Sequence, residues 1–257
     1  MTDFNKLKVD LSQERQVLNL TLNAPKGNVL DKEMMSELQK AIERKAAQSS
    51  VKAIVLRGEG AHFSFGASVP EHMKENVAEM LATFHDLLRA LIATSKPMFA
   101  LVRGQCLGGG LELAAFCHWI FAAEDAMFGQ PEIKLAVFPP VASLVLPHRI
   151  GQSAADDLVL SGRSISAAAA LHLGLVHSVS PDPEAELEKY ISEHILPRSA
   201  AALHFAVKSS RYEFHRAFLQ HIAEVEKMYV QDLMATDDAN EGIAAFLEKR
   251  KPVWKNA

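Results

Sequence analysis

A run of glycines followed by a glutamate is the segment of this 257-residue chain best suited to chemistry. Gly108, Gly109 and Gly110 are consecutive, and Glu112 follows them within an apolar helical pattern. Glycines at a helix start permit unusual backbone angles and close approach of a ligand, and they leave N–H groups free to bind an anion. An acid in a first helical turn also interacts favourably with the helix dipole. The neighbouring glycines favour a functional carboxylate over that purely structural role.

Two further segments carry small residues or an acid that would suit such a site. Gly66 and Ala67 follow an apolar strand pattern and suit a close backbone approach, although a simple loop is the better explanation when this segment is taken alone. Glu132 lies 20 residues after Glu112, and Pro131 fixes the backbone that presents it. Two carboxyl groups with different surroundings are the usual equipment of general acid–base catalysis. Glu112 and Glu132 are therefore candidates for such a pair.

Several other chemistries are excluded by their missing motifs. The glycines lack the GxGxxG spacing of a dinucleotide site, no GK[ST] follows them, and neither GxSxG nor HExxH occurs. The 11 histidines are scattered, and His215 and His221, six residues apart, lie off the same-face spacing of a metal pair. A formal net charge of -4 argues against nucleic acid as a partner. We therefore expect no metal ion, no redox cofactor and no nucleic-acid ligand.

The first half of the chain alternates strand and helix patterns. Residues 17–22, 51–56 and 98–102 have the apolar patterns of strands. Apolar residues at helical spacing follow Asp31, a suitable N-cap, and recur over residues 77–92. This alternation predicts a largely parallel sheet with covering helices, an α/β fold.

The second half of the chain, from about Gly151, is predicted to be mostly helical. The expected helices cover residues 166–173, 184–196, 199–234 and 237–246. No Gly/Ser-rich linker separates the two halves, so we expect one domain with a helical C-terminal extension.

Composition indicates an ordinary globular protein of a reducing compartment. The chain has 49% hydrophobic residues and two cysteines, Cys106 and Cys117, which are too few for a disulfide scaffold. Its N-terminal residues lack the apolar core of a secretion signal, and its apolar stretches are too short to span a bilayer. We expect a cytoplasmic protein without a membrane partner.

Five segments in chain order resemble the motifs of the crotonase, or enoyl-CoA hydratase/isomerase, superfamily. Residues 107–114 match its LGGGxELA helix start almost letter for letter. Four others resemble its LNRPxxNAL, AGAD, QPE and AFxEKR elements, and they are residues 23–30, 64–68, 130–132 and 245–250. Ala24 replaces the arginine of the first of these elements, and Ser68 replaces the aspartate of the second. The resemblance covers nearly the whole chain.

The resemblance implies a crotonase-like spiral of ββα units with a helical C-terminal trimerisation region, often paired into hexamers. Residues 1–195 would form the core with the acyl-CoA site, and residues 196–257 the extension that forms the oligomer and closes the site. The backbone N–H groups of Ala67 and Gly109 would form an oxyanion hole for the thioester carbonyl. Glu112 and Glu132 would position and deprotonate water and deliver a proton to carbon.

The resemblance also implies which residues contact the substrate. Lys26 and Lys249 match positions that approach the phosphates of coenzyme A, Lys249 from a neighbouring subunit. With Ala67 and Gly109, the implied substrate-binding residues are Lys26, Ser64, Phe65, Gly66, Gly108, Leu135, Phe138, Val141, Phe246 and Lys249. Coenzyme A is part of the substrate, so no separate cofactor is implied.

One departure from the family pattern bears on the substrate. After residues 130–132 the family usually carries a glycine-rich run, whereas residues 133–149 here carry prolines and aliphatic residues, which stiffen the loop. This stretch and residues 64–68 resemble the subgroup of cyclohexa-1,5-dienecarbonyl-CoA hydratases. A rigid apolar pocket would suit a cyclic dienoyl group. We therefore expect a hydro-lyase that adds water to such a thioester.

Other substrates for hydration, and functions other than hydration, stay open at this point. Hydration of a linear or cyclohexenoyl thioester would keep both glutamates and change only the acyl pocket. A double-bond isomerase or thioester hydrolase is less favoured, because such crotonases often lack one glutamate of the pair. Some crotonase-like proteins bind RNA, but the net charge of -4 argues against that class.

Overall fold

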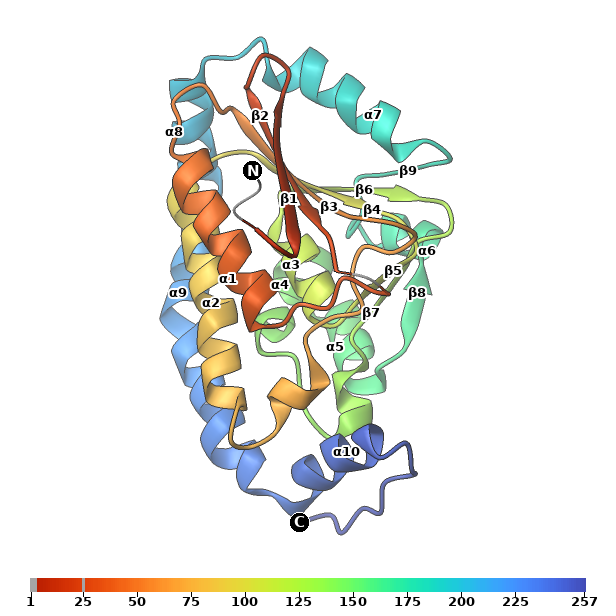
Figure 1. The fold of residues 1–257 in the computed structure, drawn as a ribbon. Coiled ribbons are helices and arrows are strands. Elements are labelled where there is room, and N and C mark those ends of the chain that lie inside the picture. Colours follow the sequence, from red (N-terminus) through yellow and green to blue (C-terminus); the bar gives the residue numbers. More distant parts are fainter. Residues whose placement is uncertain (1–3, 25) are drawn as a thin grey trace.

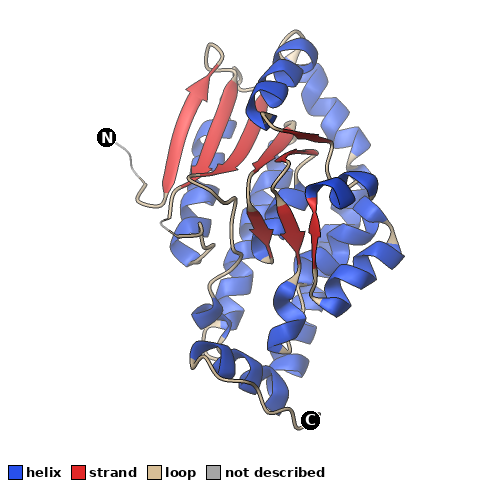
Figure 2. Cartoon of the chain, turned by 90° about the vertical axis from the view of Figure 1, so that its right-hand side faces the viewer, coloured by secondary structure: helices blue, strands red, loops and turns tan. Residues whose placement is uncertain are grey.

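The computed structural model describes residues 4–24 and 26–257 and contains two β-sheets wrapped by helices (Figures 1 and 2). The larger sheet has the strand order β1 (Leu7–Ser12), β2 (Val17–Leu22), β3 (Ala53–Gly58), β4 (Met98–Val102), β6 (Trp119–Ala123) and β9 (Ser178–Ser180). β1 and β2 are antiparallel, and the other pairs are parallel. The smaller sheet has the order β5 (Gln105–Leu107), β7 (Met127–Gly129) and β8 (Ser164–Ser166).

The chain moves between the two sheets as it advances, which is the predicted spiral of ββα units. β4 joins the larger sheet, β5 the smaller one, and α3 (Gly109–Phe116) follows. β6 and β7 repeat this step, and their path leads through η3 (Pro131–Leu135) to α4 (Pro140–Ile150). All eight residues of α3 are buried, so the helix that follows the glycines lies in the centre of the molecule (Figure 1).

Side-chain alternation along the strands gives the larger sheet two apolar faces. In β3, Ile54 and Leu56 belong to the main core, whereas Ala53 and Val55 face a second cluster, as expected for a period of two residues. The main core is covered by α1 (Lys32–Ala41) and α2 (Val77–Thr94) among others. The second cluster is covered by α7 (Pro183–Tyr190) and by η4 (Ile191–Ile195), which directly follows α7.

Most predicted elements of the first half are present. The strands over residues 17–22 and 98–102 have the predicted bounds, and the strand expected at 51–56 lies two residues later, at Ala53–Gly58. Asp31 caps α1, because its side chain accepts a hydrogen bond from the Met34 N–H at 2.9 Å. The helix of residues 77–92 corresponds to α2.

The prediction of one continuous helix over residues 199–234 is wrong. The chain forms α8 (Ala200–Ser210) and α9 (Tyr212–Lys227) with a break at Arg211, and then the short π-helix η5 (Met228–Asp232) and the 3-10 helix η6 (Leu233–Ala235). Arg211 leaves the helical conformation with φ -102° and ψ 6°. Its guanidinium donates to the Cys117 carbonyl oxygen at 3.1 Å, a contact with a residue far away in the sequence.

The remaining helices complete the C-terminal half. α9 lies beside α2, and α10 (Asp237–Leu247) crosses the end of the molecule near the C-terminus (Figure 1). The other elements are η1 (Ile42–Ala46), η2 (Val69–His72), α5 (Gln152–Ser161) and α6 (Ala167–His172). Within the described residues no helix has both the length and the apolar character needed to cross a membrane.

Candidate active site

The entry into α3 requires glycine for two physical reasons. Gly108, the N-cap of α3, has φ +51° and ψ -128°, a conformation that side chains rarely adopt. A Cβ atom at Gly108 would lie 2.6 Å from Oε1 of Glu132, so the backbone and this carboxyl group are in direct contact. The Gly108 N–H donates to the Gly129 carbonyl oxygen at 2.9 Å and thereby ties α3 to β7. The glycine run thus brings the start of α3 against Glu132.

The loop of residues 64–68 is held against the same point. Ser64 pairs with Cys106 and Ala67 with Leu30 in isolated parallel bridges. The Ser64 hydroxyl, fully buried, donates to the Asn28 carbonyl oxygen at 2.8 Å and accepts from the Gly66 N–H at 3.0 Å. Ser64 therefore fixes the shape of the loop from behind.

Two backbone amides meet where this loop contacts α3. A Cβ atom at Gly109 would lie 3.2 Å from the Ala67 nitrogen, and one at Gly66 would lie 3.3 Å from the Gly109 nitrogen. Among the described residues, neither the Ala67 N–H nor the Gly109 N–H has a hydrogen-bond acceptor. Two adjacent free donors are the equipment needed to stabilise a developing oxyanion.

Glu112 is buried in the first turn of α3. Its side chain is only 4% exposed, and its Oε1 accepts a hydrogen bond from the Ala142 N–H at 2.8 Å. Burial raises the pKa of Glu112 to about 7, and backbone hydrogen bonds from Ala142 and Val141 partly oppose this rise. A carboxyl group with this pKa exchanges its proton readily near neutral pH, as a general base must.

Glu132 lies on η3, facing the start of α3. Burial, and then the negative charge of Glu112, raise the pKa of Glu132 well above its usual range. The Gln130 amide, in the orientation that satisfies its surroundings, donates to both carboxyl oxygens of Glu132 at 3.0 and 3.1 Å. Both carboxyl groups are therefore harder to ionise than a free glutamate, and the negative charge of one opposes ionisation of the other.

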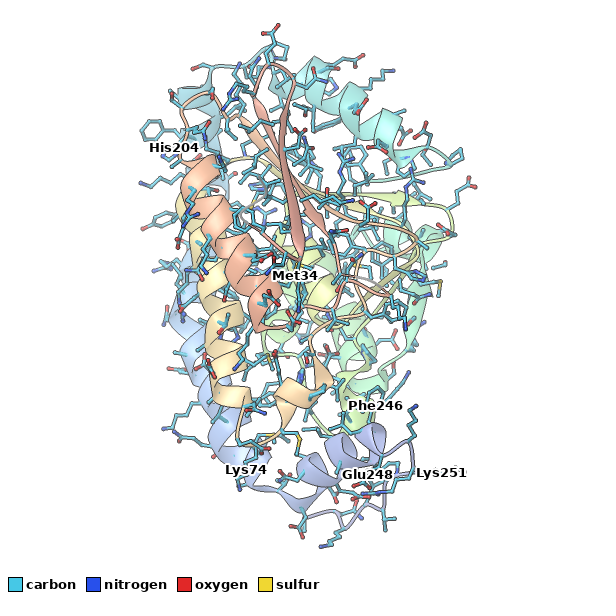
Figure 3. All side chains as sticks on the ribbon, in the orientation of Figure 1. Met34, Lys74, His204, Phe246, Glu248 and Lys251 are labelled. Carbon is cyan, nitrogen blue, oxygen red and sulfur yellow. The ribbon has the colours of Figure 1, made fainter. Side chains whose placement is uncertain are left out.

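A mostly apolar cavity of about 340 Å³ opens beside these groups. Three of its walls come from the loop 64–68, from η3 and from α10, which is close to η3. Figure 3 labels Phe246, which lies on α10. Predicted residues that line the cavity are Phe65, Ala67, Gly108, Glu132, Leu135 and Phe246.

The other predicted site residues lie outside the cavity wall. Ser64, Gly66 and Gly109 belong to the contact between the loop and the start of α3, and Glu112 is buried in the first turn of α3. Val141 is fully buried in the core, and Phe138 packs against Tyr229. Lys26 and Lys249 are exposed, and Pro25, within the predicted 23–30 element, lies outside the described residues.

Sequence analysis missed several residues that line the cavity. They are Val69, His72, Lys134, Val137, Gly242, Arg250 and Pro252. Of these, Gly242 carries a signal that could have been used, since a glycine within a helical pattern often marks a close approach. A Cβ atom there would lie 2.2 Å from the Leu135 carbonyl oxygen, so α10 and η3 touch through their backbones.

Within the described residues, no group of three or more His, Cys, Asp or Glu side chains could hold a metal ion. The positions of the two carboxyl groups next to a pair of amide donors support acid–base chemistry.

Comparison with known proteins assigns the family. The family model described as enoyl-CoA hydratase/isomerase matches residues 12–257. The chain belongs to this family. The match confirms the resemblance drawn from the five motifs.

Curated members of the enoyl-CoA hydratase/isomerase family are similar over almost their full length. The chain is 45% identical over 250 residues to the cyclohexa-1,5-dienecarbonyl-CoA hydratase of Thauera aromatica. This match covers 97% of each of the two chains. It is 35% identical over 249 residues to the 2,3-dehydroadipyl-CoA hydratase of Escherichia coli K12, with 95% of this chain and 97% of that one covered. These relatives confirm the predicted enzyme class, a hydro-lyase of the enoyl-CoA hydratase type.

Solved structures of the family agree with the fold. An enoyl-CoA hydratase from Mycobacterium avium subsp. paratuberculosis K-10 superposes with a TM-score of 0.84 at 27% identity, covering 98% of this chain and 99% of that one. One from Bacillus anthracis gives a TM-score of 0.77 at 29% identity, covering 98% and 100%. The predicted crotonase-like α/β fold with its helical C-terminal region is confirmed.

Proposed function

We propose that this protein adds water to cyclohexa-1,5-diene-1-carbonyl-CoA to form 6-hydroxycyclohex-1-ene-1-carbonyl-CoA, a step in the anaerobic degradation of aromatic compounds through benzoyl-CoA. The proposal rests on the 45% identity of this chain, over 97% of both chains, to a hydratase named for this substrate. The paired carboxyl groups beside two free amides supply the groups that such a reaction needs.

The oxyanion hole prepares the substrate for attack. The N–H groups of Ala67 and Gly109 donate to the thioester carbonyl oxygen and stabilise the negative charge that develops there. Because the two donors are fixed by the Ser64 hydroxyl and by the start of α3, they need no reorganisation during the reaction. Loss of one such donor typically slows a reaction by about 10²–10³-fold.

The two glutamates divide the proton transfers. Glu112 takes a proton from water as the water oxygen bonds to the carbon β to the thioester, and the electron pair of the double bond moves toward the carbonyl oxygen. The resulting enolate is conjugated with the second double bond of the ring, so Glu132 protonates its far end. Transfer of a proton from Glu112 to Glu132 then restores the resting state. The net change is a 1,4-addition of one water molecule.

The cavity supports a compact apolar acyl group. Val69, Leu135, Val137 and Phe246 line it beside Glu132. A preformed apolar wall binds a rigid ring at little cost in ordering entropy. Lys134 lines the same cavity and offers positive charge to the phosphates of coenzyme A, as do the exposed Lys26 and Lys249. Arg250 also lines the cavity, but its guanidinium is paired with Glu241 and Glu248.

The proposal includes a cytoplasmic homotrimer, or a dimer of trimers, that uses no cofactor. All groups required for hydration are side chains and amides of this chain, and coenzyme A enters with the substrate. Residues 1–195 would contribute the core of the site, and residues 196–257 would close it through α10.

A linear enoyl-CoA is the second candidate substrate. The similarity to a 2,3-dehydroadipyl-CoA hydratase, at 35% identity, favours it. Both substrates would use the same glutamates and the same amides, so the acyl pocket alone discriminates between them.

A substrate panel tests the proposal. Purified protein is incubated with the cyclic dienoyl-CoA, cyclohexenecarbonyl-CoA and crotonyl-CoA, and products are identified by mass and NMR. We expect kcat/KM for the diene to exceed that for crotonyl-CoA by more than tenfold, which corresponds to about 1.4 kcal/mol of transition-state binding. Equal values for the two substrates would leave only a general enoyl-CoA hydratase.

A further inference from the structure

Tyr229 is a buried side chain near the two glutamates that the mechanism above leaves unused. It lies in η5, which continues α9, and it is 1% exposed. Within the part of the chain that the structure describes, its hydroxyl has no hydrogen-bond partner. Burying a hydroxyl without a partner opposes folding. The phenol O–H therefore has no protein acceptor and is free to donate to water or to a ligand.

Contacts place the phenol ring against the segment that carries the backbone partners of both glutamates. The ring meets that of Phe138 edge-on, with 5.1 Å between the centroids. On one side of Phe138, the Val137 N–H donates to the Glu132 carbonyl oxygen at 3.3 Å. On the other side, the Ala142 N–H donates to the Glu112 carboxyl group at 2.8 Å. The Tyr229 ring therefore packs against the segment whose backbone N–H groups donate to Glu132 and Glu112.

The electrostatic surroundings keep the phenol protonated. Burial, followed by the negative charges of Glu132 and Glu112, raises the pKa of Tyr229 above its usual range. The group is therefore a neutral O–H donor at every pH at which the enzyme would work. Among the described residues no direct hydrogen bond joins it to either carboxyl group, and water commonly bridges polar groups that do not meet directly.

We propose that the Tyr229 hydroxyl donates a hydrogen bond to the water molecule that is added to the substrate, and then to the new hydroxyl group of the product. The proposal rests on the hydration reaction proposed above. The water oxygen would accept this bond with one lone pair, donate a proton to Glu112 and attack the ring carbon with its other lone pair. Tyr229 keeps its own proton throughout, so it orients the nucleophile without entering the proton balance. It is a further catalytic residue because it touches the reacting oxygen.

The variant Tyr229→Phe tests this role, since it removes the hydroxyl and preserves the ring that packs on Phe138. We expect kcat to fall at least tenfold and KM for the acyl-CoA to stay within twofold, because the hydroxyl would not contact coenzyme A. We also expect Tm to stay unchanged or rise, since the lost hydroxyl has no protein partner. Tyr190→Phe is the matched control, because Tyr190 packs on Phe99 and Trp119 in the second apolar cluster. This control should keep the wild-type kcat.

Two results would overturn the assignment of Tyr229. One is a wild-type kcat in Tyr229→Phe. The other is a loss of kcat accompanied by a fall in Tm of more than about 5 °C, which would identify a purely structural residue. The assays use crotonyl-CoA beside the cyclic diene. A wild-type enzyme that hydrates crotonyl-CoA but not the diene contradicts the proposed substrate, while the effect of Tyr229→Phe is still measured on crotonyl-CoA.

Discussion

At the scale of single residues, two chemically identical side chains have different surroundings. Glu112 is buried and accepts backbone hydrogen bonds, whereas Glu132 contacts Gly108 on the cavity wall and faces the charge of Glu112. The second ionisation of such a pair is opposed by the first. One group is then available as a base while the other retains a proton.

Replacing either glutamate by glutamine should separate chemistry from binding. We expect Glu112→Gln and Glu132→Gln each to lower kcat by at least about 10²-fold, the lower end for a general acid or base. Glutamine keeps the shape of the side chain, so both variants should fold and bind acyl-CoA esters. Steady-state kinetics and calorimetric titration with a CoA ester measure the two effects. Wild-type turnover by one variant would remove that residue from the mechanism.

The raised pKa of Glu112 also predicts how stability depends on pH. Its pKa is 4.5 in the unfolded chain and about 7 in the folded one, so the folded state binds more protons between these values. The stabilisation is complete below pH 4.5 and is lost as pH rises through about 7. For this group alone the loss between pH 5 and pH 8 is about 2 kcal/mol.

The variant Glu112→Gln tests this pH dependence, because glutamine does not titrate. The variant should gain free energy of unfolding relative to the wild type as pH increases from 5 to 8, measured by urea unfolding at both values. Glu59→Gln, at an exposed ion pair with Lys8, serves as the control and should show little change. An equal difference between Glu112→Gln and the wild type at pH 5 and pH 8 would contradict the raised pKa.

Some residues of this site can be predicted from the sequence, and others cannot. Glu112 and Glu132 were found because local signals, the glycine run and Pro131, accompany them. Tyr229 has no such signal, since its neighbours Phe138, Glu112 and Glu132 come from distant parts of the chain. Only the packing of η5 against the segment after η3 brings these residues together.

At the scale of elements, the contact between α10 and η3 determines one wall of the cavity. Gly242 permits it, because any larger residue would collide with the Leu135 carbonyl oxygen. Gly242→Ala should push the two elements apart and raise KM by about tenfold, with a loss of about 1–3 kcal/mol in stability from overpacking. Kinetics and thermal unfolding measure both effects.

The control for this prediction lies on the same helix. Ala244 in α10 is half-buried and does not line the cavity, so Ala244→Ser should leave KM unchanged. If Gly242→Ala has the wild-type KM, the contact between α10 and η3 does not shape the substrate site.

Elements with local signals were predicted well, and those set by distant contacts were not. β2 and β4 have their predicted bounds because alternating or continuous apolar residues define them. The break at Arg211 carries no glycine or proline signal, and the Cys117 carbonyl oxygen that accepts a hydrogen bond from its guanidinium lies far away in the sequence. For the same reason the sequence could not tell that Val141 faces the core from α4.

At the scale of the whole molecule, α8, α9 and the start of η5 present apolar side chains that the single chain leaves exposed. Phe205 is 66% exposed, Tyr212 60% and Met228 53%. Figure 1 shows α8 and α9 along one side of the molecule, and Figure 3 labels His204, the neighbour of Phe205, on that side. A concentration of exposed apolar groups in a helical extension is typical of an oligomer interface.

The proposed trimer would bury this surface, and this gives the last prediction. We expect light scattering to yield a mass three times the 28.2 kDa of one chain, or six times if trimers pair. Phe205→Asp combined with Met228→Asp should shift the mass toward that of a single chain, because charged groups in an apolar interface lose hydration without a partner. Leu160→Asp is the control, since Leu160 is equally exposed, at 69%, but lies on α5 outside residues 196–257. If Leu160→Asp dissociates the assembly and the double variant does not, the core rather than the C-terminal extension forms the interface.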